Sequence, residues 1–120
     1  MEVPIFRQGS FLIATIQAAL TDVDLLNLRN VLVQRVVQSR SRGVIVDVTS
    51  MDVLDSFASR TLSEIAHIIR LRGAETVIVG SQPEVAFSMV QLGLTLEDIP
   101  TALDLEEGLA YLNQKPKPMR

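Results

Sequence analysis

The chain has 120 residues, the usual size of a single domain with one hydrophobic core, so a two-domain enzyme is not expected. Its residues are 48% hydrophobic and 21% charged, with a mean hydropathy of +0.30, which disfavours disorder and favours association with other subunits. The 11 basic and 14 acidic residues give a net charge of −3 and form no basic block, so nucleic acid is not an expected partner.

Short apolar runs and helical periodicity alternate along the first half of the chain. Residues 3–6 and 11–16 are β-favouring runs, and the RQGS between them has the composition of a tight hairpin connection. Apolar residues then recur at helical spacing after Thr21 or Asp22, either of which can cap a helix, until the basic, glycine-terminated segment SRSRG. Residues 44–48, VIVDV, form a β-branched run typical of a central parallel strand buried on both faces.

The second half continues the alternation. Asp55-Ser56 precedes a second amphipathic helix, Phe57–Leu71, which ends at basic residues and a glycine. The remaining predicted elements are a strand at 76–79, a third helix from Pro83 to Gly93, a short strand at 96–99 and a last helix at 102–113. The order ββαβαβαβα predicts an α/β fold with a mixed, mostly parallel sheet and four helices. We expect one domain over residues 1–113 and a flexible tail over residues 114–120.

Cellular location is constrained by what the sequence lacks. Without cysteine there is no disulfide, thiolate metal site or cysteine nucleophile, which fits a reducing compartment. The longest uncharged stretch, Gln8 to Thr21, is too short and too polar to span a membrane, and the start MEVPIF does not resemble a signal peptide. We expect a cytoplasmic protein.

Motifs of common enzymes are missing from the sequence. It contains no G-x-x-x-x-G-K-[ST], G-x-G-x-x-G, H-E-x-x-H or G-x-S-x-G. The one histidine, His67, lies in the middle of the second predicted helix, where a packed or surface role is preferred to proton transfer. We therefore expect no catalytic residue, no metal site and no cofactor.

Carboxylates and hydroxyls gather in the segment VDVTSMDVLDSF, between a buried strand and a helix start. In open α/β sheets, ligands and partners usually meet the protein at such an edge. The first interpretation is structural: Asp55 or Ser56 caps the second helix, while Asp47 and Asp52 bind turn amides.

The second interpretation makes Ser56 a phosphorylation site. A hydroxyl at a helix N-terminus is exposed, and the helix dipole and free N–H groups tolerate a phosphate. The added charge of about −1.5 to −2 would arrive beside Asp52 and Asp55, on a surface that a partner desolvates. Burying that charge unpaired costs several kcal/mol, whereas the dipole returns about 0.3–1 kcal/mol, so binding weakens while the fold persists.

The element order, the segment VIVDVTSMDVLDS and the step from Asp55 to Ser56 into a helix together resemble the STAS domain of bacterial anti-anti-sigma factors. In that family, the serine after the aspartate is the target of a serine kinase. The sequence departs from the family's common D-S-[ST]-G-L-G pattern, because Asp55 is followed by SFASR without glycine. With this departure, the sequence resembles stressosome scaffold proteins of the RsbS type. Four further segments carry the same resemblance: PI at 4–5, FLIATIQ at 11–17, SQPEVA at 81–86 and TALDLEEGL at 101–109.

The resemblance implies a non-catalytic scaffold that joins RsbR-type STAS paralogues in a large assembly, as a homodimer or higher oligomer, and sequesters an RsbT-type serine/threonine kinase. Phosphorylation of Ser56 releases the kinase and so regulates the general stress response, and an RsbX-type phosphatase resets the site. Ser59 is a candidate second acceptor, although an ordinary first-turn serine is the preferred interpretation. The residues expected to flank the phosphosite or to bind partners are Asp47, Asp52, Asp55, Phe57, Arg60 and Glu64.

Three other functions stay open at this point. The chain could be a simple anti-anti-sigma factor that binds an anti-sigma kinase directly in a small complex. It could be a receiver domain phosphorylated on Asp47, although receivers need an acidic pair for Mg²⁺ and a late lysine that are missing here. The turn Gly80-Ser81-Gln82-Pro83 could also cradle a nucleotide phosphate, although a plain turn is the preferred interpretation.

Overall fold

The computed structural model describes residues 3–17, 20–51, 55–83 and 99–114. Five strands form one sheet in the order β1-β2-β3-β4-β5, in which β1 is antiparallel to β2 and every later pair is parallel. The predicted mixed, mostly parallel α/β sheet is confirmed. The described elements are β1 (Ile5–Gln8), β2 (Phe11–Thr15), α1 (Asp22–Ser39), β3 (Gly43–Asp47), α2 (Ser56–Leu71), β4 (Glu75–Val79), β5 (Thr101–Ala102) and α4 (Leu105–Gln114).

The opening hairpin forms as predicted, but its turn is tighter and later than expected. Only Gly9 and Ser10 connect the two strands, and Gln8 pairs directly with Phe11. Gly9 has a φ of 61°, a left-handed conformation that glycine adopts without the steric cost of a side chain. Arg7 and Gln8, assigned to the connection from sequence, therefore belong to β1.

Helix α1 begins at one of the two caps predicted for it, Thr21. The Thr21 hydroxyl accepts a hydrogen bond from the Asp24 amide, and the Asp24 carboxylate accepts one from the Thr21 amide, both at 3.1 Å. This reciprocal pair fixes the start of α1. The end of α1 differs from the prediction, because Arg40, with a φ of 50°, makes the left-handed turn expected of a glycine.

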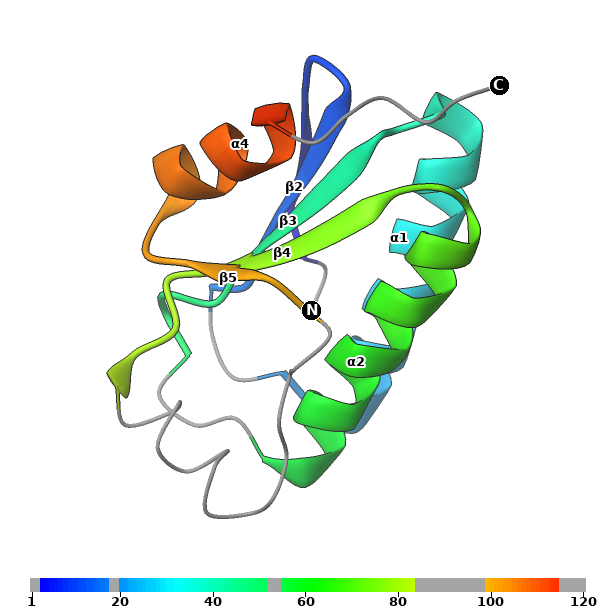
Figure 1. Cartoon of the computed structure of the whole chain (residues 1–120). Helices are drawn as coiled ribbons and strands as arrows, with labels where there is room; N and C mark the ends of the chain where they lie inside the picture. The colour runs from blue at the N-terminus through cyan, green and yellow to red at the C-terminus, as the bar shows by residue number, and fades with distance from the viewer. Residues whose placement is uncertain (1–2, 18–19, 52–54, 84–98, 115–120) are drawn as a thin grey trace.

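Helices α1 and α2 lie side by side over one face of the sheet, and α4 covers the other face (Figure 1). Strand residues alternate between the faces, so Val44 and Val46 point toward α1 and α2 while Ile45 points toward α4. All three are fully buried, which confirms that β3 is a central strand covered on both sides.

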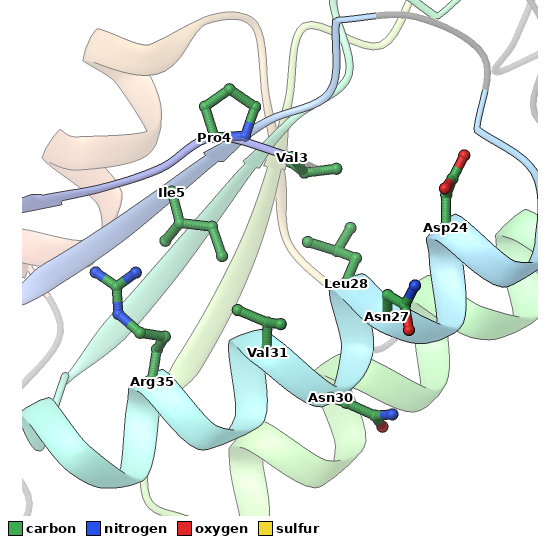
Figure 2. A pocket seen from close by; sticks show the side chains of 9 residues that line it. All are labelled: Val3, Pro4, Ile5, Asp24, Asn27, Leu28, Asn30, Val31 and Arg35. Carbon is green, nitrogen blue, oxygen red and sulfur yellow. The ribbon is translucent and has the colours of Figure 1, made fainter. Parts of the chain in front are cut away.

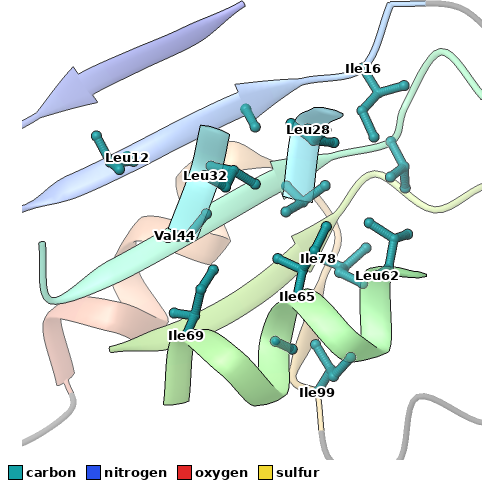
Figure 3. Close-up of a cluster of buried hydrophobic side chains, with 14 of the residues drawn as sticks. Leu12, Ile16, Leu28, Leu32, Val44, Leu62, Ile65, Ile69, Ile78 and Ile99 are labelled. Carbon is teal, nitrogen blue, oxygen red and sulfur yellow. The ribbon is translucent and has the colours of Figure 1, made fainter. Parts of the chain in front are cut away.

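The larger part of the core lies beneath α1 and α2, where aliphatic side chains from both helices meet the sheet (Figure 3). Leu32 from α1 and Ile65 and Ile69 from α2 are fully buried there. Burying one such side chain contributes about 1.5–3 kcal/mol. This layer holds α2, and with it the helix N-terminus at Ser56, in place on the sheet.

The smaller part of the core lies beneath α4, and it depends on a close approach of helix to strand. A Cβ added at Gly108 would lie 2.7 Å from Cγ1 of Val79, closer than side-chain contacts allow. Leu112, one turn further along α4, is buried against this face of the sheet. Glycine at position 108 therefore lets α4 pack directly on β4.

The last helix was predicted too early, since α4 begins at Leu105 instead of residue 102. Strand β5 pairs at Thr101–Ala102, and apart from Ile99 the strand predicted at 96–99 lies outside the described residues. The Asp104 carboxylate accepts a hydrogen bond from the Glu107 amide at 2.9 Å, which sets this helix start.

The described residues contain three helices, against the four that were predicted. Apart from Pro83, the predicted helix from Pro83 to Gly93 lies outside the described residues. Helix α4 also includes Gln114, which the prediction placed in the tail. Within the described ranges, no helix combines the length and the hydropathy needed to cross a membrane.

Candidate functional site

The parallel strands end at one edge of the sheet, which we call the carboxyl edge, and the segment predicted to carry function lies there. Strand β3 ends at Asp47, and α2 begins at Ser56 (Figure 1). Asp55 precedes the helix as its cap, with its Oδ1 accepting a hydrogen bond from the Ala58 amide at 2.8 Å. The predicted capping role of Asp55 is confirmed, and the helix starts one residue earlier than expected.

Ser56 is half-buried and is the first residue of α2. The amides of Ala58 and Ser59 already donate to the carboxylate and carbonyl of Asp55, at 2.8 and 3.0 Å. The amides of Ser56 and Phe57 belong to the first turn, where N–H groups have no acceptor within the helix. The Ser56 hydroxyl therefore lies at the positive end of the α2 dipole, beside N–H groups that have no acceptor within the helix.

Ser59, the candidate second acceptor, is more deeply buried than Ser56, which is itself half-buried and not exposed as predicted. Its side chain is only 2% exposed, and among the described atoms its hydroxyl has no hydrogen-bond partner. A kinase cannot reach a hydroxyl buried in this way unless the first turn of α2 opens. The structure therefore separates the two serines by accessibility.

Asp47 takes part in a hydrogen-bonded arrangement of which sequence analysis predicted the bond to a turn amide and missed the link to the loop after β4. Its Oδ1 accepts bonds from the amide and the hydroxyl of Thr49, at 2.9 and 2.6 Å. The side-chain amide of Gln82 donates to the Thr49 carbonyl at 3.0 Å, which ties the loop after β4 to the loop after β3. We call these residues, together with Gly80, the clasp.

The clasp requires glycine at position 80. It has a φ of +79°, and a Cβ added there would lie only 1.9 Å from the Thr49 hydroxyl oxygen. Sequence analysis preferred a plain turn over a phosphate cradle for Gly80-Ser81-Gln82-Pro83, and within this turn Gln82 binds the neighbouring loop. The predicted role of Asp47 as a binder of turn amides is confirmed.

The predicted partner-binding residues that the structure describes differ in burial and in their contacts. Phe57 is half-buried and packs against the core. Glu64 is 2.6 Å from Arg29 of α1, an exposed ion pair of the kind that contributes about 0–1 kcal/mol. Arg60 is exposed on α2. His67 is exposed as well, which is the second of the two positions, packed or surface, that were predicted for it. Asp52 lies outside the described residues.

A groove of about 640 Å³ lies apart from these residues, between α1 and the segment that enters β1. Figure 2 shows Val3 and Ile5 on one side and the α1 side chains on the other, with Asp24 and Arg35 toward opposite ends. It contains none of the predicted site residues. Throughout the described ranges, His, Asp and Glu side chains do not gather in groups of three suited to a metal ion.

Comparison with known proteins agrees with the fold. The STAS domain family matches residues 3–108, and the chain belongs to this family. Among curated proteins it is similar to the RsbT co-antagonist protein RsbRA of Bacillus subtilis, with 32% identity over 78 residues. That match covers 65% of this chain and only 28% of the relative, so the chain spans little more than a quarter of RsbRA.

Solved structures point to the same branch of the family. A serine-to-glutamate variant of RsbS from Moorella thermoacetica superposes with a TM-score of 0.82 and 29% identity, over 92% of this chain and 94% of that one. A chain from a structure of the stressosome, described as a signal integration and transduction hub, gives a TM-score of 0.77 and 27% identity over 92% and 96% of the two chains. The chain is thus a STAS protein of the stressosome type.

Proposed function

We propose that this chain is a non-catalytic stressosome scaffold that joins RsbR-type STAS proteins, holds an RsbT-type serine/threonine kinase and releases it when Ser56 is phosphorylated. The observation that carries the proposal is the position of Ser56 at the start of α2, directly after the capping Asp55. The similarity to an RsbT co-antagonist and to a stressosome chain supports the choice of partners.

The electrostatics of this helix start support a switch that acts on binding more than on folding. A phosphate on Ser56 would lie near the first-turn amides of α2, which stabilise an anion by about 0.3–1 kcal/mol. The same charge would lie beside the Asp55 carboxylate. A partner that covers this edge would have to bury both charges, at a cost of several kcal/mol. Since each 1.4 kcal/mol is about tenfold in affinity, this cost is enough to release a kinase.

Mapping the modified residue tests the proposal directly. We expect that incubation with the RsbT-type kinase and ATP adds one phosphate, located at Ser56 by mass spectrometry of the intact protein and its peptides. Ser63 is the matched control, since it is a half-buried serine in the same helix, away from its N-terminus. Ser56→Ala should abolish phosphorylation and Ser63→Ala should leave it intact. Phosphate on another residue in the wild-type chain would contradict the proposal.

Binding measurements test the release step separately. We expect Ser56→Ala to hold the kinase as tightly as the unphosphorylated wild type does, and to keep holding it when ATP is added, whereas the wild type releases it. Ser56→Asp should bind at least about tenfold more weakly, because it places a second carboxylate beside Asp55. Ser63→Asp should bind like the wild type. Equal kinase affinity for the phosphorylated and unphosphorylated chains would refute the switch.

The assembly test distinguishes a stressosome scaffold from a simple anti-anti-sigma factor. We expect size-exclusion chromatography of the chain with an RsbR-type protein to give a large common complex that also retains the kinase. An RsbX-type phosphatase should restore kinase binding to the phosphorylated chain. A complex of only the chain and one kinase, formed without any RsbR-type protein, would favour the simpler function.

A further inference from the structure

Arg42 lies at the opposite edge of the sheet from Ser56, just before β3 begins. Its amide donates to the Ser10 carbonyl at 2.8 Å, and its carbonyl accepts from the Glu75 amide at 3.1 Å. Its guanidinium carbon lies 5.9 Å from the centre of the Phe11 ring, within range of a cation–π contact. The backbone and the aromatic ring thus hold this side chain at a fixed place between the hairpin turn and β4.

A pocket of about 360 Å³ opens beside this guanidinium. Its lining includes polar side chains that can donate hydrogen bonds and apolar side chains. None of the lining residues is acidic. The side chains that matter for binding are those of Arg42, Gln8, Ser10 and Asn113, with the apolar Phe11 and Leu109.

One N–H donor of the Arg42 guanidinium, at Nε, has no acceptor among the described atoms. The Nε atom is buried, and no ion pair joins Arg42 to a carboxylate in the described ranges. A buried charged donor without an acceptor costs free energy, so such groups are normally paired in the functional state. Asn113 belongs to the last turn of α4, and the negative end of the α4 dipole stabilises a cation at this place. This dipole does not supply an acceptor for the Nε–H group of Arg42.

We propose that this pocket binds a carboxylate, supplied either by a small organic acid or by the free C-terminus of a peptide. The planar guanidinium matches a carboxylate through two parallel N–H···O bonds. The Ser10 hydroxyl and the Asn113 amide lie in the same wall as further donors, and Leu109 gives an apolar surface for the attached carbon chain. A single guanidinium balances one negative charge, and the α4 dipole opposes a second, which favours a carboxylate over a phosphate dianion. This inference is independent of Ser56 and of the proposed kinase.

Titration of the ¹⁵N-labelled chain, followed by NMR, tests the proposal. The probes are acetate, propionate, and a short peptide with a free C-terminus beside the same peptide amidated, all at constant ionic strength with chloride as the reference salt. We expect saturable shifts of the Arg42 side-chain Nε–H and of the Ser10 and Asn113 amides. Response to both acids and peptide acid defines a general carboxylate site, and response to the peptide acid alone defines a peptide-terminus site. Shifts that stay linear and match those of chloride would overturn the proposal.

Three variants separate recognition from general charge. Arg42→Gln should weaken binding at least about tenfold, and Arg42→Lys should do nearly the same, because lysine keeps the charge and loses the planar fork. Arg72→Gln is the matched control, since it removes an exposed arginine from the same edge of the sheet and should leave affinity unchanged. If Arg42→Gln does not fold, Asn113→Ala provides the test with the guanidinium intact. Unchanged affinity in a folded Arg42→Gln chain would refute the site.

Discussion

The two edges of the sheet each carry a charged side chain, Asp47 or Arg42, and these two side chains differ in whether the chain supplies their hydrogen-bond partners. At the carboxyl edge, Asp47 binds two donors of Thr49, and Gln82 binds the Thr49 carbonyl. At the other edge, the buried Nε of Arg42 has no acceptor among the described atoms. A charged group that is satisfied from within the chain holds loops in place, whereas a charged group left unsatisfied can bind an acceptor from outside. Under the two proposals, the preorganised carboxyl edge changes only its surface charge, and the second edge accepts a ligand.

Gly80→Ala is expected to damage the preorganised edge most. The added Cβ would lie 1.9 Å from the Thr49 hydroxyl oxygen, and the φ of +79° adds backbone strain. We expect the free energy of unfolding, measured by urea denaturation, to fall by about 2–4 kcal/mol.

Gly73→Ala is the matched control for this substitution. Gly73 has a similar φ of +85°, but an added Cβ there meets nothing within 4 Å. It should therefore lose only the backbone contribution, about 1–2 kcal/mol. Adding Thr49→Ala to Gly80→Ala should recover part of the difference, because it removes the clashing hydroxyl. Equal losses in the two glycine variants would show that the clasp is not tightly packed.

Asp47→Ala is expected to have the next largest effect. It removes the acceptor of two hydrogen bonds, to the amide and the hydroxyl of Thr49. We expect a loss of about 1–3 kcal/mol in the free energy of unfolding, and faster exchange of the Thr49 amide hydrogen. Asp47→Asn should lose less, because its side-chain oxygen can still accept. If Asp47→Ala left both quantities unchanged, the clasp would not be a stabilising feature.

Asp55→Ala should cost about 1 kcal/mol, because the first turn of α2 loses its cap. Thermal unfolding measures this loss, and Asp104→Ala gives a comparison, since Asp104 caps α4 in the same way. Amide exchange should rise at Ala58 in the Asp55 variant and at Glu107 in the Asp104 variant. Faster exchange throughout α2 would instead mean that Asp55 holds the whole helix.

Much of the fold could be predicted because its signals are local. The β-branched run before Asp47 predicted β3, and Thr21 and Asp55 predicted the starts of two helices, since caps and strand patterns depend on neighbouring residues. The end of α1 was less predictable, because Arg40 takes a conformation that glycine usually provides. The two-residue strand β5 is too short to leave a pattern.

The site was only partly predictable, because its contacts join distant segments. The sequence predicted that Asp47 binds turn amides and that Asp55 caps α2, both of which are contacts within three residues. The bond from Gln82 to Thr49 spans 33 positions, and the one from Arg29 to Glu64 spans 35. No spacing rule links such residues before the sheet brings them together. The burial of Ser59 likewise depends on how α2 lies on the sheet.

Ser56→Asp is expected to change stability least, although it alters the residue on which the proposed switch depends. A carboxylate in the first turn gains about 0.3–1 kcal/mol from the helix dipole, and repulsion from Asp55 offsets part of this gain. We expect the free energy of unfolding, from urea denaturation, to stay within about 0.5 kcal/mol of the wild type. Ser63→Asp should destabilise more, because Ser63 is equally half-buried but lies away from the helix N-terminus, whose dipole stabilises an anion. If Ser56→Asp were the more damaging of the two, Ser56 would be a structural residue, and the carboxyl edge could not act as a switch that leaves the fold intact.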